Sequence, residues 1–296
     1  MRVLVTGGSG FVGRYVVREL LARGLAVRCL VRPGSEGKLA AGEGVEVCAG
    51  NVLHPDEVAR AAAGCEAAVH LVGIIREFPG RGVTFEKVHV QATENVVNAA
   101  RDAGARRFLQ MSALGARPEP ADPYHLTNFR ADELVQKSGI PYTIFRPSVI
   151  YGPEDQSLNL FAKQIKTLRV APVIGDGLYQ MQPVPVTTVA QAFALALELP
   201  HTENRIYEVG GPEPLTFNEI IDTLAQVLGR RVLKVHVMVW SLRLLSGLCG
   251  RFPWFPLSTG QIRMLLEGNT CDATAFYREF GLEAVSLREG LAKYLS

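Results

Sequence analysis

Short apolar runs alternate with longer amphipathic ones over the first 150 residues of the chain. The short runs predict strands, and the spacing of apolar residues in the longer ones predicts helices. The expected strands are 2–7, 26–32, 45–50, 67–73, 107–113 and 142–152, and the expected helices are 11–23, 55–63, 86–103 and 124–138. Because the strand runs are continuously apolar, we expect a mostly parallel sheet that helices cover on both faces.

The rhythm becomes irregular after residue 152, where prolines interrupt the pattern. A helix at 187–199 and a strand at 205–210 are expected to return to the main sheet. From about residue 212 onward the pattern is mainly helical, with helices expected at 216–228, 240–249, 259–267 and 286–295. The second half therefore reads as a cap that is interleaved with the first half.

A glycine-rich turn follows the first expected strand and opens the first expected helix. In "VTGGSGFVGRYVVREL", Gly8, Gly10 and Gly13 fit G-x-G-x-x-G, and Gly7 extends the pattern to T-G-x-x-G-x-x-G. Such glycines permit a tight turn and a close backbone approach to a pyrophosphate, which the N–H groups of the helix N-terminus then bind. The alternative is a glycine-rich turn without a ligand. The motif lies between the first strand and the first helix of a βαβ unit, and this position favours dinucleotide binding.

These patterns together predict an α/β fold with a Rossmann doubly wound parallel sheet. We expect the NAD(P)-binding domain to span 1–152, with 187–210 returning to it. The smaller, mostly helical cap or substrate region is expected to span 153–296.

The end of the second expected strand separates NAD from NADP. An acidic residue there accepts a hydrogen bond from the ribose 2′-hydroxyl, whereas an arginine accommodates the 2′-phosphate. Here the strand ends in "LVRPGSEGK", with Arg32 in that position and Lys38 just beyond it. The alternative reading of Arg32 is a solvated surface residue. We predict NADP(H) in preference to NAD(H).

Two further strand ends carry weaker signals of the same cofactor. In "GNVLHPDEV", Asn51 is placed to bond the adenine edge and Val52 to pack against the ring. In "HLVGI", Gly73 allows the chain to pass close to the cofactor. Their order along the chain matches that of a dinucleotide site.

Charge and composition exclude several other classes of function. The chain has 296 residues, 48% of them hydrophobic, and its 31 basic and 29 acidic residues leave a net charge of +2. This balance indicates no binding of nucleic acid. The basic pairs Arg106–Arg107 and Arg230–Arg231 are interpreted as solvated ends of elements.

Cysteine usage and hydropathy bear on location. The five cysteines are an odd count without a Cys-x-x-Cys pair, which favours free thiols in a reducing, cytoplasmic compartment. The apolar stretch 235–255 contains Arg243 and Arg251, so a core or interfacial helix is expected there and no transmembrane segment. The alternative to a free cytoplasmic protein is one that lies at the periphery of a membrane. Trp254 and Phe255 make an apolar small molecule or a protein the expected partner of the cap.

The chain resembles the short-chain dehydrogenase/reductase superfamily in TGGSGFVG, GNV, HLVG, Ser112 after the fifth strand and Tyr124 on the next helix. "RPSVIYGPED", "QPVPVTTVAQAF" and "YEVGGPEPLTFNEII" narrow this to an atypical branch, the extended-like NAD-dependent epimerase/dehydratases. That branch includes the nucleotide-binding accessory subunit of respiratory complex I and its bacterial relatives. The implied cofactor contacts are Thr6, Gly7, Gly10, Phe11, Val12, Gly13, Arg32, Lys38, Asn51, Val52, Leu71, Val72, Gly73, Met111, Tyr124 and Pro147.

The resemblance also implies a catalytic set, from which this sequence departs. Active members use a tyrosine as general acid/base and a lysine four residues later, whose charge favours the tyrosinate. Here the tyrosine is Tyr124 and the lysine position is Asn128. Ser112 either polarises a substrate carbonyl or caps a turn. His89 lies where relatives often carry a structural asparagine, and the nearby Asn95 and Asn98 are expected to be solvated.

Three functions follow from these residues. Asn128 favours a NADP(H)-holding subunit or assembly-type protein with little turnover. A NADPH-dependent reductase of a carbonyl or quinone-like substrate is the alternative, because Tyr124 can donate a proton as the neutral phenol. A nucleotide-sugar epimerase or dehydratase is the third, and the missing lysine counts against it. Whether the protein is an enzyme is left open by the sequence.

Overall fold

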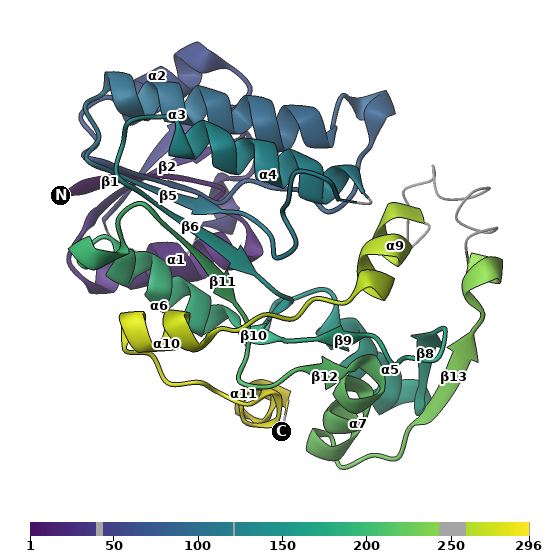
Figure 1. The fold of residues 1–296 in the computed structure, drawn as a ribbon. Helices are drawn as coiled ribbons and strands as arrows, with labels where there is room; N and C mark the ends of the chain where they lie inside the picture. The colour runs from purple at the N-terminus through teal and green to yellow at the C-terminus, as the bar shows by residue number, and fades with distance from the viewer. Residues whose placement is uncertain (40–43, 121, 243–258, 296) are drawn as a thin grey trace. The chain divides into compact units, whose positions relative to one another are not determined.

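A seven-stranded sheet is the centre of the fold. The computed structural model describes residues 1–39, 44–120, 122–242 and 259–295 (Figure 1). The strands of this sheet are β1 (Arg2–Thr6), β2 (Ala26–Val31), β3 (Val45–Ala49), β4 (Ala67–His70), β5 (Arg107–Met111), β6 (Tyr142–Pro147) and β11 (Arg205–Val209). Their order is β11-β6-β5-β4-β1-β2-β3, and every neighbouring pair from β6 to β3 is parallel. The predicted α/β doubly wound fold is confirmed.

Helices cover both faces of the sheet (Figure 1). α1 (Phe11–Ala22) packs against α6 (Val186–Ala196), and α10 (Thr274–Phe280) contacts α6 in turn. On the opposite face α3 (Ala92–Asp102) packs between α2 (Pro55–Ala62) and α4 (Pro123–Gln136). Strand side chains are therefore buried on both sides, which is why Val3, Leu4 and Val5 in succession have no exposed surface.

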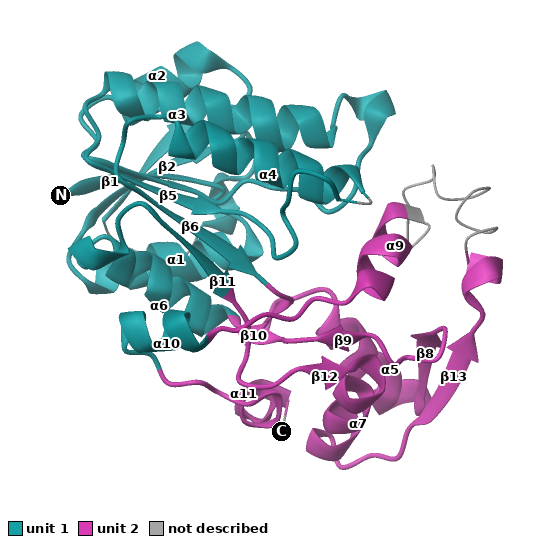
Figure 2. Cartoon of the chain, in the orientation of Figure 1, with its two compact units in different colours: residues 1–147, 186–208, 274–282 teal, residues 148–185, 209–273, 283–296 magenta. Residues whose placement is uncertain are grey.

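The chain divides into two compact units (Figure 2). Unit 1 holds the sheet and consists of residues 1–147, 186–208 and 274–282. Unit 2 consists of residues 148–185, 209–273 and 283–296. The sequence pattern indicated the return of α6 and β11 to the sheet, but it did not indicate that α10 returns as well.

Unit 2 combines helices with three two-stranded sheets. The helices that are described over their full length are α5 (Leu158–Leu168), α7 (Phe217–Val227), α9 (Thr259–Glu267) and α11 (Leu287–Leu295). Its strand pairs are β7 (Ile150–Tyr151) with β10 (Val184–Pro185), β9 (Gln180–Met181) with β12 (Leu215–Thr216), and β8 (Val170–Ile174) with β13 (Leu233–Val237). Phe217, Ile220 and Leu224 on one face of α7 form much of its core. A Thr216–Glu219 capping box starts this helix.

The structure differs from the predicted elements in two places. The helix expected at 86–103 begins as a π-helical segment, η3 (Glu86–Gln91), and becomes α3 only at Ala92. At the start of the apolar stretch 235–255 the sequence pattern missed a strand, because residues 233–237 form β13 and pair in parallel with β8. Short apolar runs fit either element, and here strand pairing decided. The helix expected at 240–249 does begin there, since residues 239–242 are helical. Residues 243–258, with Trp254 and Phe255, lie outside the described residues.

No described helix is both long and apolar enough to span a bilayer.

Arg107 corrects the reading of the pair Arg106–Arg107 as solvated ends. The Arg106 side chain is 82% exposed, but Arg107 is only 5% exposed. The Arg107 guanidinium donates to the carbonyl of Ala196 (3.0 and 3.1 Å) and to the hydroxyls of Thr143 (2.6 Å) and Thr202 (2.7 Å). It therefore ties β5 to β6 and to the end of α6. Residue type alone cannot tell which of two adjacent arginines is exposed and which is buried.

Arg107→Leu is expected to lower the free energy of unfolding by about 2 to 4 kcal/mol, because it leaves a carbonyl and two hydroxyls buried without their donor. Arg106→Leu is the matched control and should cost less than about 0.5 kcal/mol. Urea denaturation of both variants measures the difference. Equal losses would contradict the buried role of Arg107.

Candidate functional site

The glycine turn between β1 and α1 is held by its own backbone. Gly7 has φ +80°, and a Cβ on it would lie 2.9 Å from the carbonyl carbon of Leu71. A Cβ on Gly13 would lie 2.1 Å from the carbonyl oxygen of Gly7. These positions therefore require glycine for the turn itself and for the approach of α1 to the strands. The motif predicted from the sequence has the expected strand-turn-helix context.

The start of α1 fits the phosphates of a dinucleotide. The helix begins at Phe11, Gly10 makes no side-chain cap, and the first turn contains no acidic residue. The N–H groups of the first helical turn, including those of Phe11 and Val12, have no intrahelical acceptor. These groups and the helix dipole attract an anion at this position.

The predicted cofactor residues meet at the carboxyl edge of the sheet. Parallel strands end at one edge, and the order β4-β1-β2 places the reversal of strand order between β1 and β4, where ligands bind in such sheets. Thr6 ends β1. Leu71 follows the neighbouring strand β4 and donates its N–H to the Thr6 carbonyl (3.0 Å). Met111 and Pro147 end β5 and β6 at this same edge.

The edge near β2 carries positive charge. Arg32 follows β2 directly and is exposed, and Lys38 ends the short 3₁₀ helix η1 (Glu36–Lys38) with its side chain also exposed. Below the turn, Cys29 is buried against Gly8, and burial raises the pKa of its thiol to about 12. Cys29 is thus an inert packing group, as predicted for a buried free thiol.

Asn51 and Val52 form a fixed loop after β3. The Asn51 side-chain oxygen accepts a hydrogen bond from the Leu53 N–H (3.1 Å). The backbone N–H of Asn51 donates to the Glu57 carboxylate (2.6 Å). Asn95 on α3 donates to the Val52 carbonyl (2.9 Å). Asn95 is therefore half-buried and structural, which corrects its expected solvation, and Asn98 is half-buried too.

Val72 and Gly73 lie in the segment after β4, beside the glycine turn. Val72 is half-buried and Gly73 is exposed. A Cβ on Gly73 would make only ordinary contacts, at 3.7 Å from the Nε2 of His89. The described residues around Gly73 therefore do not require a glycine, and its predicted contact with the cofactor stays a prediction.

Tyr124 lies in the first turn of α4, and no cation among the described residues lowers its pKa. Its ring packs edge-on against Phe85 (5.7 Å between centroids) and His89 (5.5 Å). Burial, with a smaller contribution from the nearby Asp122, raises the pKa of Tyr124 to about 12. Arg130, on the same helix, is bound to Glu86 at 2.6 and 2.8 Å. The phenol is therefore held in its neutral form at physiological pH.

Asn128 and His89 fill the space one helical turn from Tyr124. The amide nitrogen of Asn128 donates to the Tyr124 carbonyl (2.9 Å) and lies 3.5 Å from Nδ1 of His89. Burial lowers the pKa of His89 to about 4. Both side chains are buried and neutral, so neither supplies the charge that a lysine would. The sequence placed Asn128 correctly but gave no sign that His89 contacts it.

Ser112 is engaged by a buried ion pair. Its hydroxyl donates to Asp132 (3.0 Å), and the same carboxylate accepts from Arg146 at 2.8 and 2.9 Å. Burial raises the pKa of Asp132 to about 6, although Arg146 and Ser112 oppose this. In this arrangement the Ser112 hydroxyl ties β5 to α4 and β6 and is directed at Asp132. Arg146, which lies within β6, therefore has a structural role.

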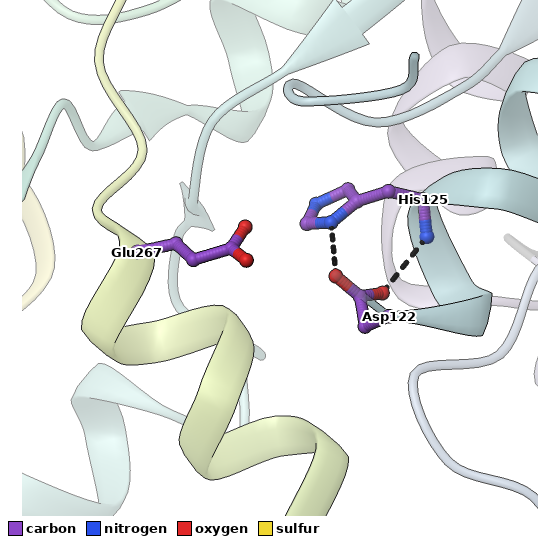
Figure 3. A group of neighbouring side chains, drawn as sticks. All are labelled: Asp122, His125 and Glu267. Atoms are coloured by element: carbon purple, nitrogen blue, oxygen red, sulfur yellow. Dashed lines mark hydrogen bonds and ion pairs between the residues drawn. The ribbon is translucent and has the colours of Figure 1, made fainter. Parts of the chain in front are cut away.

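A second polar pair starts α4 (Figure 3). Asp122 caps the helix by accepting from the His125 N–H (3.0 Å), and its other oxygen lies 2.6 Å from Nδ1 of the His125 ring. Burial raises the pKa of Asp122, but these hydrogen bonds outweigh it and leave the pKa lowered. Asp followed by Pro123 is an N-cap signature that sequence reasoning could have used.

The model of the NAD dependent epimerase/dehydratase family matches residues 3–210 of this chain. Since that match covers more than half of it, the chain belongs to this dinucleotide-binding family. The fold is also that of the UDP-glucose 4-epimerase of Thermus thermophilus, in a structure solved with NAD. The two chains superpose with a TM-score of 0.79 at 22% identity, over 100% of this chain and 98% of the other.

Two curated relatives narrow the branch. The mitochondrial 40 kDa subunit of NADH-ubiquinone oxidoreductase from Neurospora crassa is 25% identical over 98% of this chain and 78% of its own length. A 4-hydroxy-2-methyl-3-oxo-4-farnesyl-3,4-dihydroquinoline-1-oxide ketoreductase from Stigmatella aurantiaca is 31% identical, over 67% of this chain and 65% of its own. The resemblance to the complex I branch that the sequence motifs suggested is confirmed.

Buried histidines make the stability of the protein depend on pH. The pKa of His89 is lowered to about 4 and that of His70 to about 3, both by burial, against about 6.5 in an unfolded chain. Below pH 6.5 the unfolded chain binds protons that the folded one does not. Stability should therefore fall as the pH drops from 6.5 towards 4, by up to about 1.4 kcal/mol per pH unit for each histidine.

His89→Asn removes one of these two groups and should reduce that slope by up to about 1.4 kcal/mol per pH unit, while Asp132, with its pKa raised to about 6, makes a contribution of opposite sign in both proteins. Urea denaturation at several pH values between 4.5 and 7 measures it. His201→Asn, at an exposed histidine whose ring contacts a backbone carbonyl, is the control and should change the slope less than His89→Asn does. A His89→Asn protein with the original slope would show that His89 is not buried in its neutral form.

Proposed function

We propose that this member of the NAD dependent epimerase/dehydratase family holds NADP(H) as a retained nucleotide with little turnover, as a subunit of a larger redox assembly. The observation that carries the proposal is the absence of a cation beside Tyr124 among the described residues. Asn128 and His89 adjoin it as neutral groups, and Arg130 is bound to Glu86.

The argument is electrostatic. A base must accept a proton, and a phenol with a pKa of about 12 is ionised in about one molecule in 100,000 at pH 7. Oxidation of an alcohol or epimerisation of a sugar needs that base, whereas tight nucleotide binding does not. The glycine turn and the start of α1 retain the features that bind phosphates. The site therefore favours holding a nucleotide over base-driven chemistry.

The choice of NADP(H) rests on Arg32 and Lys38. Both are exposed at the end of β2 and just beyond, where the ribose 2′ position of a dinucleotide would lie. The guanidinium of Arg32 suits a phosphate because it offers several donors in one plane.

The subunit role is supported by the likeness to the 40 kDa subunit of NADH-ubiquinone oxidoreductase over 98% of this chain. The predicted apolar partner surface at Trp254 and Phe255 lies outside the described residues and remains a prediction. Association with a membrane-bound assembly would make the location peripheral to the membrane.

A carbonyl or quinone-like reductase is the second candidate. Reduction uses Tyr124 only as a proton donor, for which the neutral phenol suffices. The 31% identical ketoreductase supports this candidate. Ser112, which would polarise the carbonyl, is hydrogen-bonded to Asp132, and this weakens the candidate.

Arg32→Glu should weaken NADPH binding by about 10- to 100-fold, since it replaces a phosphate-binding cation with an anion. NADH binding should change less than about threefold, because NADH lacks the 2′-phosphate. Arg60→Glu on α2 makes the same charge change at an exposed position and is the control. Fluorescence titration of the wild type and both variants with each nucleotide measures the six affinities. An equal loss for both nucleotides would contradict the assignment of Arg32.

Turnover separates the proposed functions. With NADPH and a quinone or a cyclic ketone, a nucleotide-holding protein should oxidise NADPH no faster than the buffer control does. Steady oxidation that is lost in Tyr124→Phe would establish the reductase instead. Conversion of UDP-glucose in the presence of NAD⁺ or NADP⁺, which accepts the hydride from the sugar, would overturn both.

A further inference from the structure

His89 is fixed by hydrogen bonds at both ring nitrogens. Nε2 lies 3.1 Å from the backbone nitrogen of Ile74 and 3.0 Å from its carbonyl oxygen, and Nδ1 lies 2.9 Å from the Thr127 hydroxyl. Both ring nitrogens therefore have a partner whichever of them carries the proton. The imidazole is thus held in one orientation between η3, α4 and the segment after β4.

The His89 ring packs directly against Tyr124 and the residues around it. Phe85 stacks on His89 at 5.3 Å and 26°, and Tyr124 meets it edge-on at 5.5 Å. The Asn128 amide lies 3.5 Å from Nδ1. His89 is 3% exposed and Asn128 is 7% exposed, so the space around both is filled by protein.

We propose that His89 and Asn128 are one coupled unit: the fixed imidazole occupies the place that a cation beside Tyr124 would need, so a lysine at position 128 acts on Tyr124 only when His89 is also replaced. The inference rests on the proposed function, in which the Tyr124 site carries no positive charge. It makes His89 a positioning residue that acts on Tyr124 through the residue at position 128.

Sterics and charge both support the coupling. A lysine at 128 is longer than asparagine, and the imidazole, whose Nδ1 lies 3.5 Å from the Asn128 amide nitrogen, stands beside the space that the longer chain would need. Both ring nitrogens already have partners in Thr127 and Ile74, so the imidazole has no free acceptor for an ammonium group, which is only a donor. A buried ammonium without an acceptor is costly, so the lysine should lose its proton or turn away from the tyrosine.

Other charged groups facing Tyr124 do not change this balance. Asp122 raises the pKa of the tyrosine, and its carboxylate is engaged by His125. Arg130 is held by Glu86 on η3. Replacing His89 by asparagine opens space beside position 128 and adds an amide oxygen that can accept from an ammonium group.

The test is a double-mutant cycle of the full chain: wild type, Asn128→Lys, His89→Asn and His89→Asn/Asn128→Lys. Tyrosines carrying ¹³C at Cζ are titrated by NMR up to pH 10.5, and Tyr124→Phe identifies the signal. In the wild type and both single variants Tyr124 should stay protonated throughout. In the double variant its pKa should lie lower by about 1 to 3, as for an opposite charge within reach.

Thermal unfolding gives a second readout. Asn128→Lys should lose the most Tm, and adding His89→Asn should restore about half of the loss or more, because the two changes are not additive. If the single variant does not fold and the double variant does, the coupling is established by stability alone. A single Asn128→Lys change that lowers the pKa as far as the double, or equal instability of the two proteins, overturns the coupling.

These outcomes are distinct from failure of the proposed function. If Tyr124 of the wild type ionises well below pH 10, the charge-free site is wrong whatever the variants do. If it stays protonated and the single lysine variant behaves like the double, the proposed function stands and only the coupling between His89 and Asn128 falls.

Discussion

The close approach of the glycine turn to the end of β4 is the constraint on which the site depends. Gly7 lies so near Leu71, and Gly13 so near Gly7, that no side chain fits at either position. This contact fixes α1 against the sheet with its N-terminus at the point where strand order reverses. Because the parallel strands all end at that edge, strand direction alone brings the residues that follow them together there.

Holding a nucleotide and moving a proton are separable in this arrangement. The phosphate-binding features belong to backbone and glycine, which a substitution on α4 leaves untouched. The proton-transfer features depend on single side chains, and in this structure two of those side chains lack the surroundings that proton transfer needs. Ser112 is bonded to Asp132, and Tyr124 has neutral neighbours in His89 and Asn128. The same fold can therefore keep its cofactor while losing base-driven chemistry.

Sequence patterns predicted those features that depend on local periodicity. Continuous apolar runs predicted the strands of the main sheet, and the glycine spacing predicted the turn before α1. They failed where long-range contacts decide, as in β13, whose pairing with β8 joins segments far apart in the chain. Arg107 is buried because α6 returns to cover it, which its own neighbours in the sequence do not reveal. The contact of His89 with Asn128 likewise joins two helices and has no signal in either segment.

The most direct test of the account is to denature freshly purified protein and identify the nucleotide that it releases. Retention of NADP(H) at about one molecule per chain is the predicted result, because the phosphate-binding turn and Arg32 are intact and little turnover exchanges the cofactor. Protein that is empty, or that carries NAD(H), would contradict the central claim that this site is a holder of NADP(H).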